Sequence, residues 1–354
     1  MNNIQKFLSQ LSCAAIIQNP KNRRYLTGFS SSDGVLLICE KPYLLLDFRY
    51  AESARIKKQQ GIIPAEIEII CPERSFFTEV LQIMQKCDCK TLAFEENYVT
   101  FKAYKDMCKA LDGIHLIPLE NAVEKLRQIK SEDELKKIKA AQEITDSAFE
   151  HILGFISRDR TETEIAAEID HYFRQNGAFT AFDTICVSGA KSSLPHGVPE
   201  NIPITPNGFL TMDFGACLDG YCSDMTRTVV VGKADEKMKS VYSTVLEAQD
   251  AALSVIHGGI IGKEADSAAR DVIYNAGYKG CFGHSLGHSL GLDIHESPNF
   301  SPKNEFPVPS GSVLSVEPGI YIEGLYGVRI EDIVYLTDEG CINLTRSTKK
   351  LIEL

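Results

Sequence analysis

Three of the eight histidines in the chain, His284, His288 and His295, lie within twelve residues of one another and among glycines. Imidazole nitrogens bind transition metals and exchange protons near neutral pH, and glycine lets a ligand approach the backbone closely. A single histidine is usually a hydrogen-bonded core or surface residue, whereas three histidines in such a segment favour a metal-binding or catalytic role. The segment therefore predicts a metal or catalytic site.

A predicted hairpin brings two aspartates together. Asp219-Gly220 lies between two strand-like runs and is typical of a type I′ turn, which needs positive φ at both positions. In that register Gly215 lies opposite Asp224, and Asp213 projects on the same face as Asp224, as a diagonal neighbour. The hairpin alone leaves two interpretations open. The carboxylates share a cation or a proton, or they form a solvated pair on the outer face.

Three further candidates carry weaker signals by themselves. Glu317 and Glu331 each interrupt an apolar run, 313–317 and 328–336, that otherwise fits a buried strand. Either glutamate alone also fits an edge strand with polar alternation. His196, in the loop Pro195-His-Gly, alone fits a surface histidine better than a catalytic one.

The elements that position these residues predict two domains, 1-123 and 124-354, in a chain of 354 residues. The first is a smaller α/β domain, in which short apolar runs alternate with helical stretches around a mixed sheet. Its predicted helices are 4–11 and 50–59, and its predicted strands are 14–17, 35–39 and 43–47, followed by a further αβ alternation over 76–117.

The second predicted domain is α+β, with hairpins against helices. Capping boxes at Ser131-Glu-Asp-Glu134 and Thr161-Glu-Thr-Glu164 open its first two helices, and Gly177 ends the second. Further helices are predicted at 237–256 and 265–276, and strands at 183–187, 209–216, 221–231, 313–317 and 328–336.

Composition narrows the class of protein. Apolar residues make up 44% and charged residues 24%, as in globular proteins, and the net charge of −11 argues against a nucleic-acid partner. Apolar runs stay below the roughly 18 residues needed to span a membrane, and the first residues do not resemble a signal peptide. The eleven scattered cysteines fit buried residues or free thiols. We therefore expect a cytoplasmic protein.

Together these segments resemble the pita-bread metallopeptidases, the family of prolidase, aminopeptidase P and methionine aminopeptidase, from about residue 124 to the C-terminus. The resemblance is specific because five ligand positions occur in order within their local motifs. It implies a C-terminal pita-bread domain that binds two divalent metal ions, Mn²⁺ or Co²⁺ or alternatively Zn²⁺, a choice that fits the donor types. The implied ligands are Asp213, Asp224, His288, Glu317 and Glu331, with Asp224 and Glu331 bridging.

This resemblance also implies a mechanism. A hydroxide held between two ions would attack the scissile carbonyl, and Glu317 would carry its proton to the leaving nitrogen. His196 and His295 resemble the family histidines that bind substrate and stabilise the tetrahedral intermediate.

Three features resemble the proline-specific branch: His284, four residues before the ligand histidine, Arg329, two residues before Glu331, and a creatinase-like N-terminal domain with an Asp47-Phe-Arg-Tyr motif. They imply short proline-containing peptides as substrates, cleaved by an Xaa-Pro dipeptidase or aminopeptidase, and a homodimer. A broader-specificity aminopeptidase, a metal-free creatinase-like hydrolase and an inactive binding scaffold are the alternatives. The motif around the predicted ligand histidine is Gly287-His288-Ser289, where the family more commonly has Gly-His-Gly.

Overall fold

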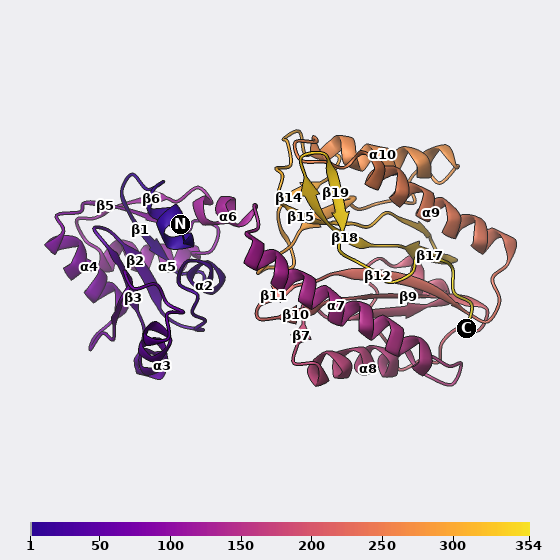
Figure 1. Cartoon of the computed structure of the whole chain (residues 1–354), viewed down its shortest axis with the longest axis horizontal. Coiled ribbons are helices and arrows are strands. Elements are labelled where there is room, and N and C mark those ends of the chain that lie inside the picture. Colours follow the sequence, from indigo (N-terminus) through magenta and orange to yellow (C-terminus); the bar gives the residue numbers. More distant parts are fainter. Residues whose placement is uncertain (1) are drawn as a thin grey trace. The chain divides into compact units, whose positions relative to one another are not determined.

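The computed structural model describes residues 2–354, and the chain divides into two compact units, Met1–Arg127 and Gln128–Leu354 (Figure 1). The boundary predicted between residues 123 and 124 lies inside helix α6 (Ala122–Arg127), which contacts α1 (Asn3–Leu8) and α2 (Pro20–Thr27) of the first unit. Met1, where the predicted N-terminal domain begins, lies outside the described residues.

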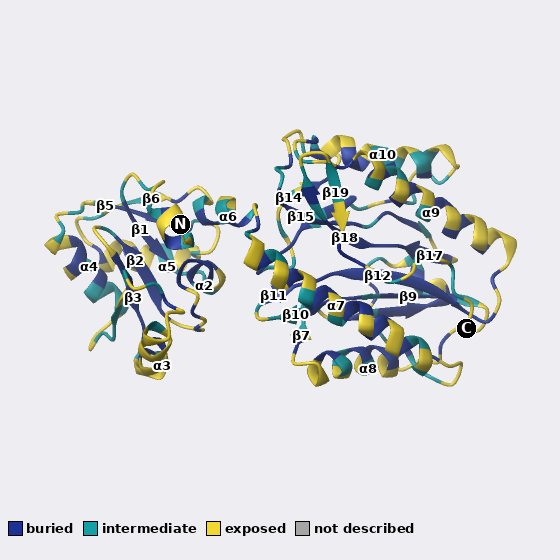
Figure 2. Cartoon of the chain, in the orientation of Figure 1, coloured by how far each residue is buried: buried dark blue, intermediate teal, exposed yellow. Residues whose placement is uncertain are grey.

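The first unit is built on a six-stranded mixed sheet in the order β4-β3-β2-β1-β5-β6. Its central pairs, β1–β2 and β2–β3, are antiparallel, and the outer pairs are parallel. Both faces of β1 and β2 are buried, because helices cover the sheet on each side (Figure 2). The remaining elements are β1 (Ala14–Ile17), β2 (Val35–Ile38), β3 (Pro42–Leu45), β4 (Glu68–Ile70), β5 (Thr91–Phe94), β6 (His115–Pro118), α3 (Phe48–Gln59), α4 (Phe76–Lys86) and α5 (Phe101–Ala110).

The second unit contains four small antiparallel sheets and two helix pairs. The sheets have the orders β12-β9-β8, β11-β10-β7, β14-β13-β15-β18-β19 and β16-β17. Its strands are β7 (Phe179–Thr180), β8 (Ile185–Ser188), β9 (Gly208–Phe214), β10 (Ala216–Leu218), β11 (Tyr221–Cys222), β12 (Met225–Val231), β13 (Gly287–Ser289), β14 (Glu296–Phe300), β15 (Val313–Val316), β16 (Gly319–Ile322), β17 (Tyr326–Arg329), β18 (Asp332–Thr337) and β19 (Gly340–Asn343).

Two helix pairs cover these sheets on opposite sides (Figure 1). Helices α7 (Glu132–Phe155) and α8 (Glu162–Gln175) bury a core against β9 and β12, and α9 (Glu236–Val255) and α10 (Gly262–Asn275) bury a second core against β15, β17 and β18. Both predicted capping boxes are present, and Gly177 follows α8 with a φ of +75°. Within residues 2–354, none of the helices has the length and apolar character of a membrane span.

The predicted aspartate hairpin is confirmed. Asp219 and Gly220 have φ values of +46° and +72°, as a type I′ turn requires, and β10 pairs with β11 directly across them. The same register continues where Met225 of β12 pairs with Phe214 of β9. Gly215 therefore lies opposite Asp224, as the sequence predicts.

Among the predicted strands that were too long, three are divided or ended at an acidic residue, whereas the run 209–216 divides into β9 and β10 at Gly215. The run 221–231 divides into β11 and β12 at Asp224, and the run 328–336 divides into β17 and β18 at Glu331. The third run, 313–317, ends one residue before Glu317. The physical reason for the first two cuts is a change of partner, because the chain leaves one sheet at the acidic residue and joins another.

Candidate metal centre

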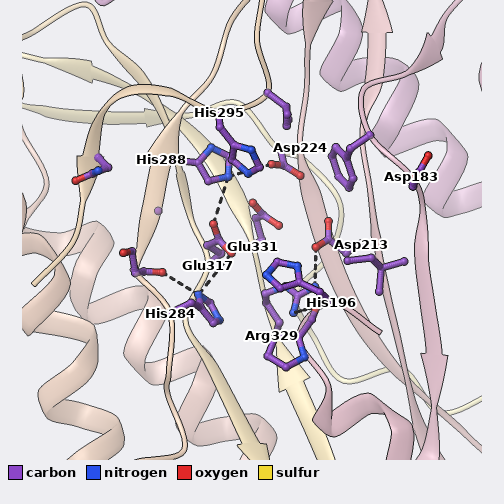
Figure 3. Close-up of a pocket in the computed structure, with 17 residues that line it drawn as sticks. Asp183, His196, Asp213, Asp224, His284, His288, His295, Glu317, Arg329 and Glu331 are labelled. Carbon is purple, nitrogen blue, oxygen red and sulfur yellow. Dashed lines mark hydrogen bonds and ion pairs between the residues drawn. The ribbon is translucent and has the colours of Figure 1, made fainter. Parts of the chain in front are cut away.

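A cavity of about 480 Å³ in the second unit gathers the predicted site residues (Figure 3). They come from segments far apart in the chain, and the strand breaks at Asp224 and Glu331 bring carboxylates to its wall. All nine predicted residues line it: His196, Asp213, Asp224, His284, His288, His295, Glu317, Arg329 and Glu331.

The five predicted ligands converge within the cavity. Nε2 of His288 lies 3.5 Å from Oδ2 of Asp224 and 3.5 Å from Oε1 of Glu317. One ligand atom each of Asp224, His288 and Glu331 lies within 4.8 Å of the others. Buried oxygens of Asp213, Asp224 and Glu331 have no hydrogen-bond partner. These oxygens are acceptors that a cation would satisfy.

The protonation states of this cluster also favour a cation. Burial raises the pKa of Asp224, and the charges of Asp213 and Glu317 raise it further. Burial and the neighbouring carboxylates raise the pKa of Glu331 in the same direction, and burial raises the pKa of Glu317 to about 8. Four carboxylates in one buried site repel one another unless positive charge or protons neutralise them. The donor set therefore fits divalent metal ions.

His288 is ready to act as a ligand. Burial, with a smaller effect from His295, lowers its pKa to about 4, so its ring is neutral at neutral pH. A neutral imidazole has a lone pair that a metal can take. The rings of His288 and His295 are in edge contact, with centroids 4.4 Å apart.

Two hydroxyl groups hold the carboxylates of Glu331 and Glu317 by hydrogen bonds. Thr226 donates from Oγ1 to Oε2 of Glu331 at 2.7 Å, and Ser315 donates from Oγ to Oε1 of Glu317 at 3.1 Å. The backbone N–H of His288 donates to the same Ser315 hydroxyl at 3.0 Å. Such partners of metal ligands fix the ligand geometry. Neither residue was predicted, because a serine or threonine in a buried strand carries no signal of its own.

A second network joins Arg329 to His284. Arg329 donates from Nη2 to Oδ2 of Asp213 at 2.6 Å and from Nη1 to the hydroxyl of Tyr321 at 2.8 Å. The Tyr321 hydroxyl lies 2.8 Å from Nε2 of His284. Because that oxygen accepts from Arg329, its own proton is available to donate to His284. Nδ1 of His284 then donates to the carbonyl of Ser285 at 2.8 Å.

The pKa shifts in this network keep His284 and Tyr321 neutral and Arg329 positively charged near neutral pH. Burial, followed by the positive charge of Arg329, lowers the pKa of His284 to about 4 and keeps that ring neutral. Burial acts to lower the pKa of Arg329, but Tyr321 and Asp213 outweigh it and raise that pKa. Burial raises the pKa of Tyr321 to about 12, so it remains a hydroxyl. Tyr321 was missed from the sequence, since a tyrosine in an apolar strand usually serves packing.

His196 and His295 lie at different ends of the cluster (Figure 3). His295 lies beside His288, and His196 lies beside Arg329 and Asp213. The loop that carries His196 follows a 3₁₀ helix, η1 (Gly189–Ser193), and is tied to the site where Arg329 donates from Nη1 to the carbonyl of Pro195 at 3.4 Å. Their roles in substrate binding stay predictions.

Comparisons with known proteins identify the family of the chain. Residues 136–338 match the model of metallopeptidase family M24, and residues 1–129 match the creatinase/prolidase N-terminal domain. An Xaa-Pro dipeptidase of Pyrococcus furiosus is 33% identical over 354 residues, covering 99% of each chain.

Two solved structures extend the similarity to the fold. A structure of an Xaa-Pro dipeptidase from Bacillus anthracis has a TM-score of 0.95 and 39% identity, covering 99% of each chain. An X-Pro aminopeptidase from Thermotoga maritima has a TM-score of 0.92 and 35% identity, covering 99% of this chain and 100% of that one. The predicted family, α+β fold and two-domain architecture are confirmed. The chain therefore belongs to metallopeptidase family M24 and is a metal-dependent peptidase.

Proposed function

We propose that this chain hydrolyses the peptide bond that precedes proline, as an Xaa-Pro dipeptidase or aminopeptidase. The observation that carries the proposal is the convergence of four carboxylates and one neutral imidazole, with unpartnered oxygens, in one cavity. The relatives named above support the choice of proline. A cavity of about 480 Å³ is within the size range of small-ligand sites and suits a short peptide.

Two divalent ions would be held by Asp213, Asp224, His288, Glu317 and Glu331. The acidic donors favour Mn²⁺ or Co²⁺, with Zn²⁺ as an alternative. Ions bound there supply a nucleophilic water at neutral pH and positive charge for the developing oxyanion. The metal-free site cannot hold its four carboxylates charged without cost, so metal affinity should depend strongly on pH.

Glu317 is the proton carrier in this proposal. The nitrogen of an Xaa-Pro bond is a tertiary amide without N–H, and it leaves as an amine only after receiving a proton. The Glu317 carboxyl, held at Oε1 by Ser315, accepts the proton of the attacking water and passes it to that nitrogen. Its pKa of about 8 in the metal-free site falls when positive charge is placed beside it.

His196 and His295 bind the substrate in this proposal. Their places near opposite ends of the carboxylate cluster suit a peptide lying across the site, with the imidazoles donating to its carbonyl oxygens (Figure 3). Replacing either histidine by alanine should lower kcat by about 100-fold, as for a lost oxyanion donor. The metal content should not change, since neither belongs to the proposed ligand set.

The proposal is tested by offering three peptides to the Mn²⁺- or Co²⁺-loaded protein: Xaa-Pro, Xaa-Pro-Yaa and the proline-free Met-Ala-Ser. Cleavage of the dipeptide alone indicates a dipeptidase, and cleavage of the tripeptide indicates an aminopeptidase. Cleavage of Met-Ala-Ser alone would refute the proline preference and favour a broader aminopeptidase. No cleavage by a metal-loaded protein would favour a binding scaffold.

The homodimer and the cytoplasmic location expected from the sequence stay predictions. Sedimentation velocity measures the first, and fractionation of cells measures the second.

A further inference from the structure

A buried ion pair contacts the segments that carry two neighbouring histidines of the site, His288 and His295. Nζ of Lys130 lies 3.1 Å from Oε2 of Glu296, and their side chains are 1% and 7% exposed. Glu296 follows His295 in the chain. Burying two charges is costly unless further hydrogen bonds satisfy them, so the partners of this pair indicate what it holds in place.

Ser289 is the third member of this arrangement. Lys130 donates from Nζ to the Ser289 hydroxyl at 3.2 Å, and that hydroxyl donates to the carbonyl of Val313 at 2.9 Å. Ser289 is fully buried and is absent from the residues that line the cavity, although its neighbour His288 lines it. The serine at this position, where glycine is commoner, therefore contacts Lys130 and does not line the cavity.

These contacts meet at an irregular point of the sheet. Strands β13 and β14 pair with a register shift between His288 and Ser289, and Ser289 pairs there with Glu296. A bulge of this kind redirects the side chain beside it. The Lys130 ammonium thus bridges one strand just after His288 and the other just after His295.

The bridge is anchored at both ends. The backbone N–H of Lys130 donates to the carbonyl of Gly311 at 2.8 Å, so the lysine is fixed independently of its ammonium group. Oε1 of Glu296 accepts from the backbone N–H of Asp293 at 3.0 Å. A fixed donor and a fixed acceptor leave the bulge little freedom to shift.

We propose that Lys130 and Ser289 are positioning residues, which hold the β13–β14 bulge so that His288 faces the metal ions and His295 faces the substrate. The inference rests on the proposed function, in which His288 is a ligand. Lys130 and Ser289 are not among the residues that line the cavity, so in this proposal they act through the positions of His288 and His295.

The substitution Lys130→Met distinguishes a positioning role of Lys130 from a purely electrostatic one, because the two roles change Mn²⁺ affinity in opposite directions. Removing a cation near a metal site should strengthen metal binding by Coulomb's law alone. Loss of position should weaken it, by at most the roughly 10- to 100-fold that follows the loss of a direct hydrogen-bond partner of a metal ligand. We expect the dissociation constant for Mn²⁺, measured by titration calorimetry on metal-stripped protein, to rise in Lys130→Met.

Two more variants keep the test decisive if Lys130→Met folds poorly. Ser289→Ala removes a single hydroxyl and should weaken Mn²⁺ binding roughly 2- to 10-fold, the equivalent of one hydrogen bond. Lys130→Met/Glu296→Gln removes both buried charges, so it should regain thermal stability while Mn²⁺ binding stays weak. Ile152→Ala, in the core of α7 and α8, is the control that loses stability but keeps wild-type Mn²⁺ affinity.

Mn²⁺ binding by the wild-type protein tests the proposed function, and the difference between wild type and the variants tests the positioning role. Wild-type protein that binds no Mn²⁺ would overturn that function, whatever the variants do. Wild-type binding with unchanged or tighter binding in Lys130→Met and Ser289→Ala would overturn the positioning role alone. Recovery of full affinity in the double variant would also overturn it, because the ammonium bridge is still missing there.

Discussion

Replacing Arg329 by methionine should destabilise the metal-free protein far more than the metal-loaded protein. Among the described residues that line the cavity, Arg329 is the only lysine or arginine, and its side chain is 3% exposed. Without it, Oδ2 of Asp213 loses its 2.6 Å partner, and Oδ1 of that residue already has none. The substitution therefore leaves the Asp213 carboxylate, whose side chain is only 14% exposed, without a hydrogen-bond donor on either oxygen.

The magnitude follows from the loss of one partner of a buried ion pair, which costs about 3–5 kcal/mol. For a domain of the size of Gln128–Leu354, 1 kcal/mol corresponds to about 2–4 °C in Tm, so the metal-free variant should melt roughly 6–20 °C below wild type. Bound divalent ions would supply positive charge to Asp213 and reduce this gap.

Differential scanning fluorimetry with excess chelator and with excess Mn²⁺ measures both values. Arg329→Lys is the matched control, because it keeps the charge but lacks the fork that reaches Asp213 and Tyr321 together, and should lose an intermediate amount. A metal-free Arg329→Met protein that melts within about 2 °C of wild type, on the same conversion, would refute the reasoning. So would a gap that Mn²⁺ leaves unchanged.

Tyr321→Phe removes the hydroxyl that contacts His284, so kcat should fall about 10-fold or more while Mn²⁺ stoichiometry stays the same; unchanged kcat would exclude a role for this network. Burial raises the pKa of Glu317 to about 8, so its contribution to stability is present below its unfolded pKa and is lost as pH rises through about 8. The metal-free protein should therefore melt lower at about pH 8.5 than at pH 6, and the gain in Tm on adding Mn²⁺ should be larger at the higher pH; an equal gain would contradict this. Gly287→Ala places a Cβ 1.9 Å from a carbonyl oxygen of the neighbouring strand and should cost about 3 kcal/mol or more in urea unfolding, whereas Gly283→Ala, with open space around it, should cost far less.

The aspartate pair could be predicted because local rules fix it. The turn at Asp219-Gly220 demands positive φ at two adjacent residues, and this sets the register of the hairpin. Side chains alternate along a strand, so the register carries directly to Asp213 and Asp224. The histidines could be predicted from residue type, because three imidazoles among glycines have few other uses.

The supporting residues could not be predicted, because their roles depend on long-range packing. Tyr321 meets His284 and Arg329 only once β16 and β17 pair, and nothing in the strand itself indicates where its hydroxyl lies. Lys130 meets Ser289 across more than 150 positions of the chain. The break at Glu331 was also missed. The apolar residues on both sides of it favour one continuous strand, and the change of sheet there depends on long-range packing.

Helices α2 and α6 were both missed from the sequence, although α2 carries a local signal. Asn19 caps α2, and Pro20 occupies its first turn, a typical helix start. The polar run that follows lacks the apolar spacing on which the helix predictions relied. The short strands β13 (Gly-His-Ser) and β14 (Glu-Ser-Pro-Asn-Phe) were missed because glycine, proline, asparagine and glutamate are depleted in strands.

The central claim is that the converging carboxylates and His288 hold two divalent ions. Titration of metal-stripped protein with Mn²⁺ at about pH 8, followed by calorimetry, measures the stoichiometry in wild type and in Asp224→Ala. We expect about two ions per wild-type chain, as in two-metal hydrolases, and loss of binding in the variant, because the missing carboxylate lies within reach of both His288 and Glu331. Full stoichiometry in Asp224→Ala, or no binding in wild type, would contradict it.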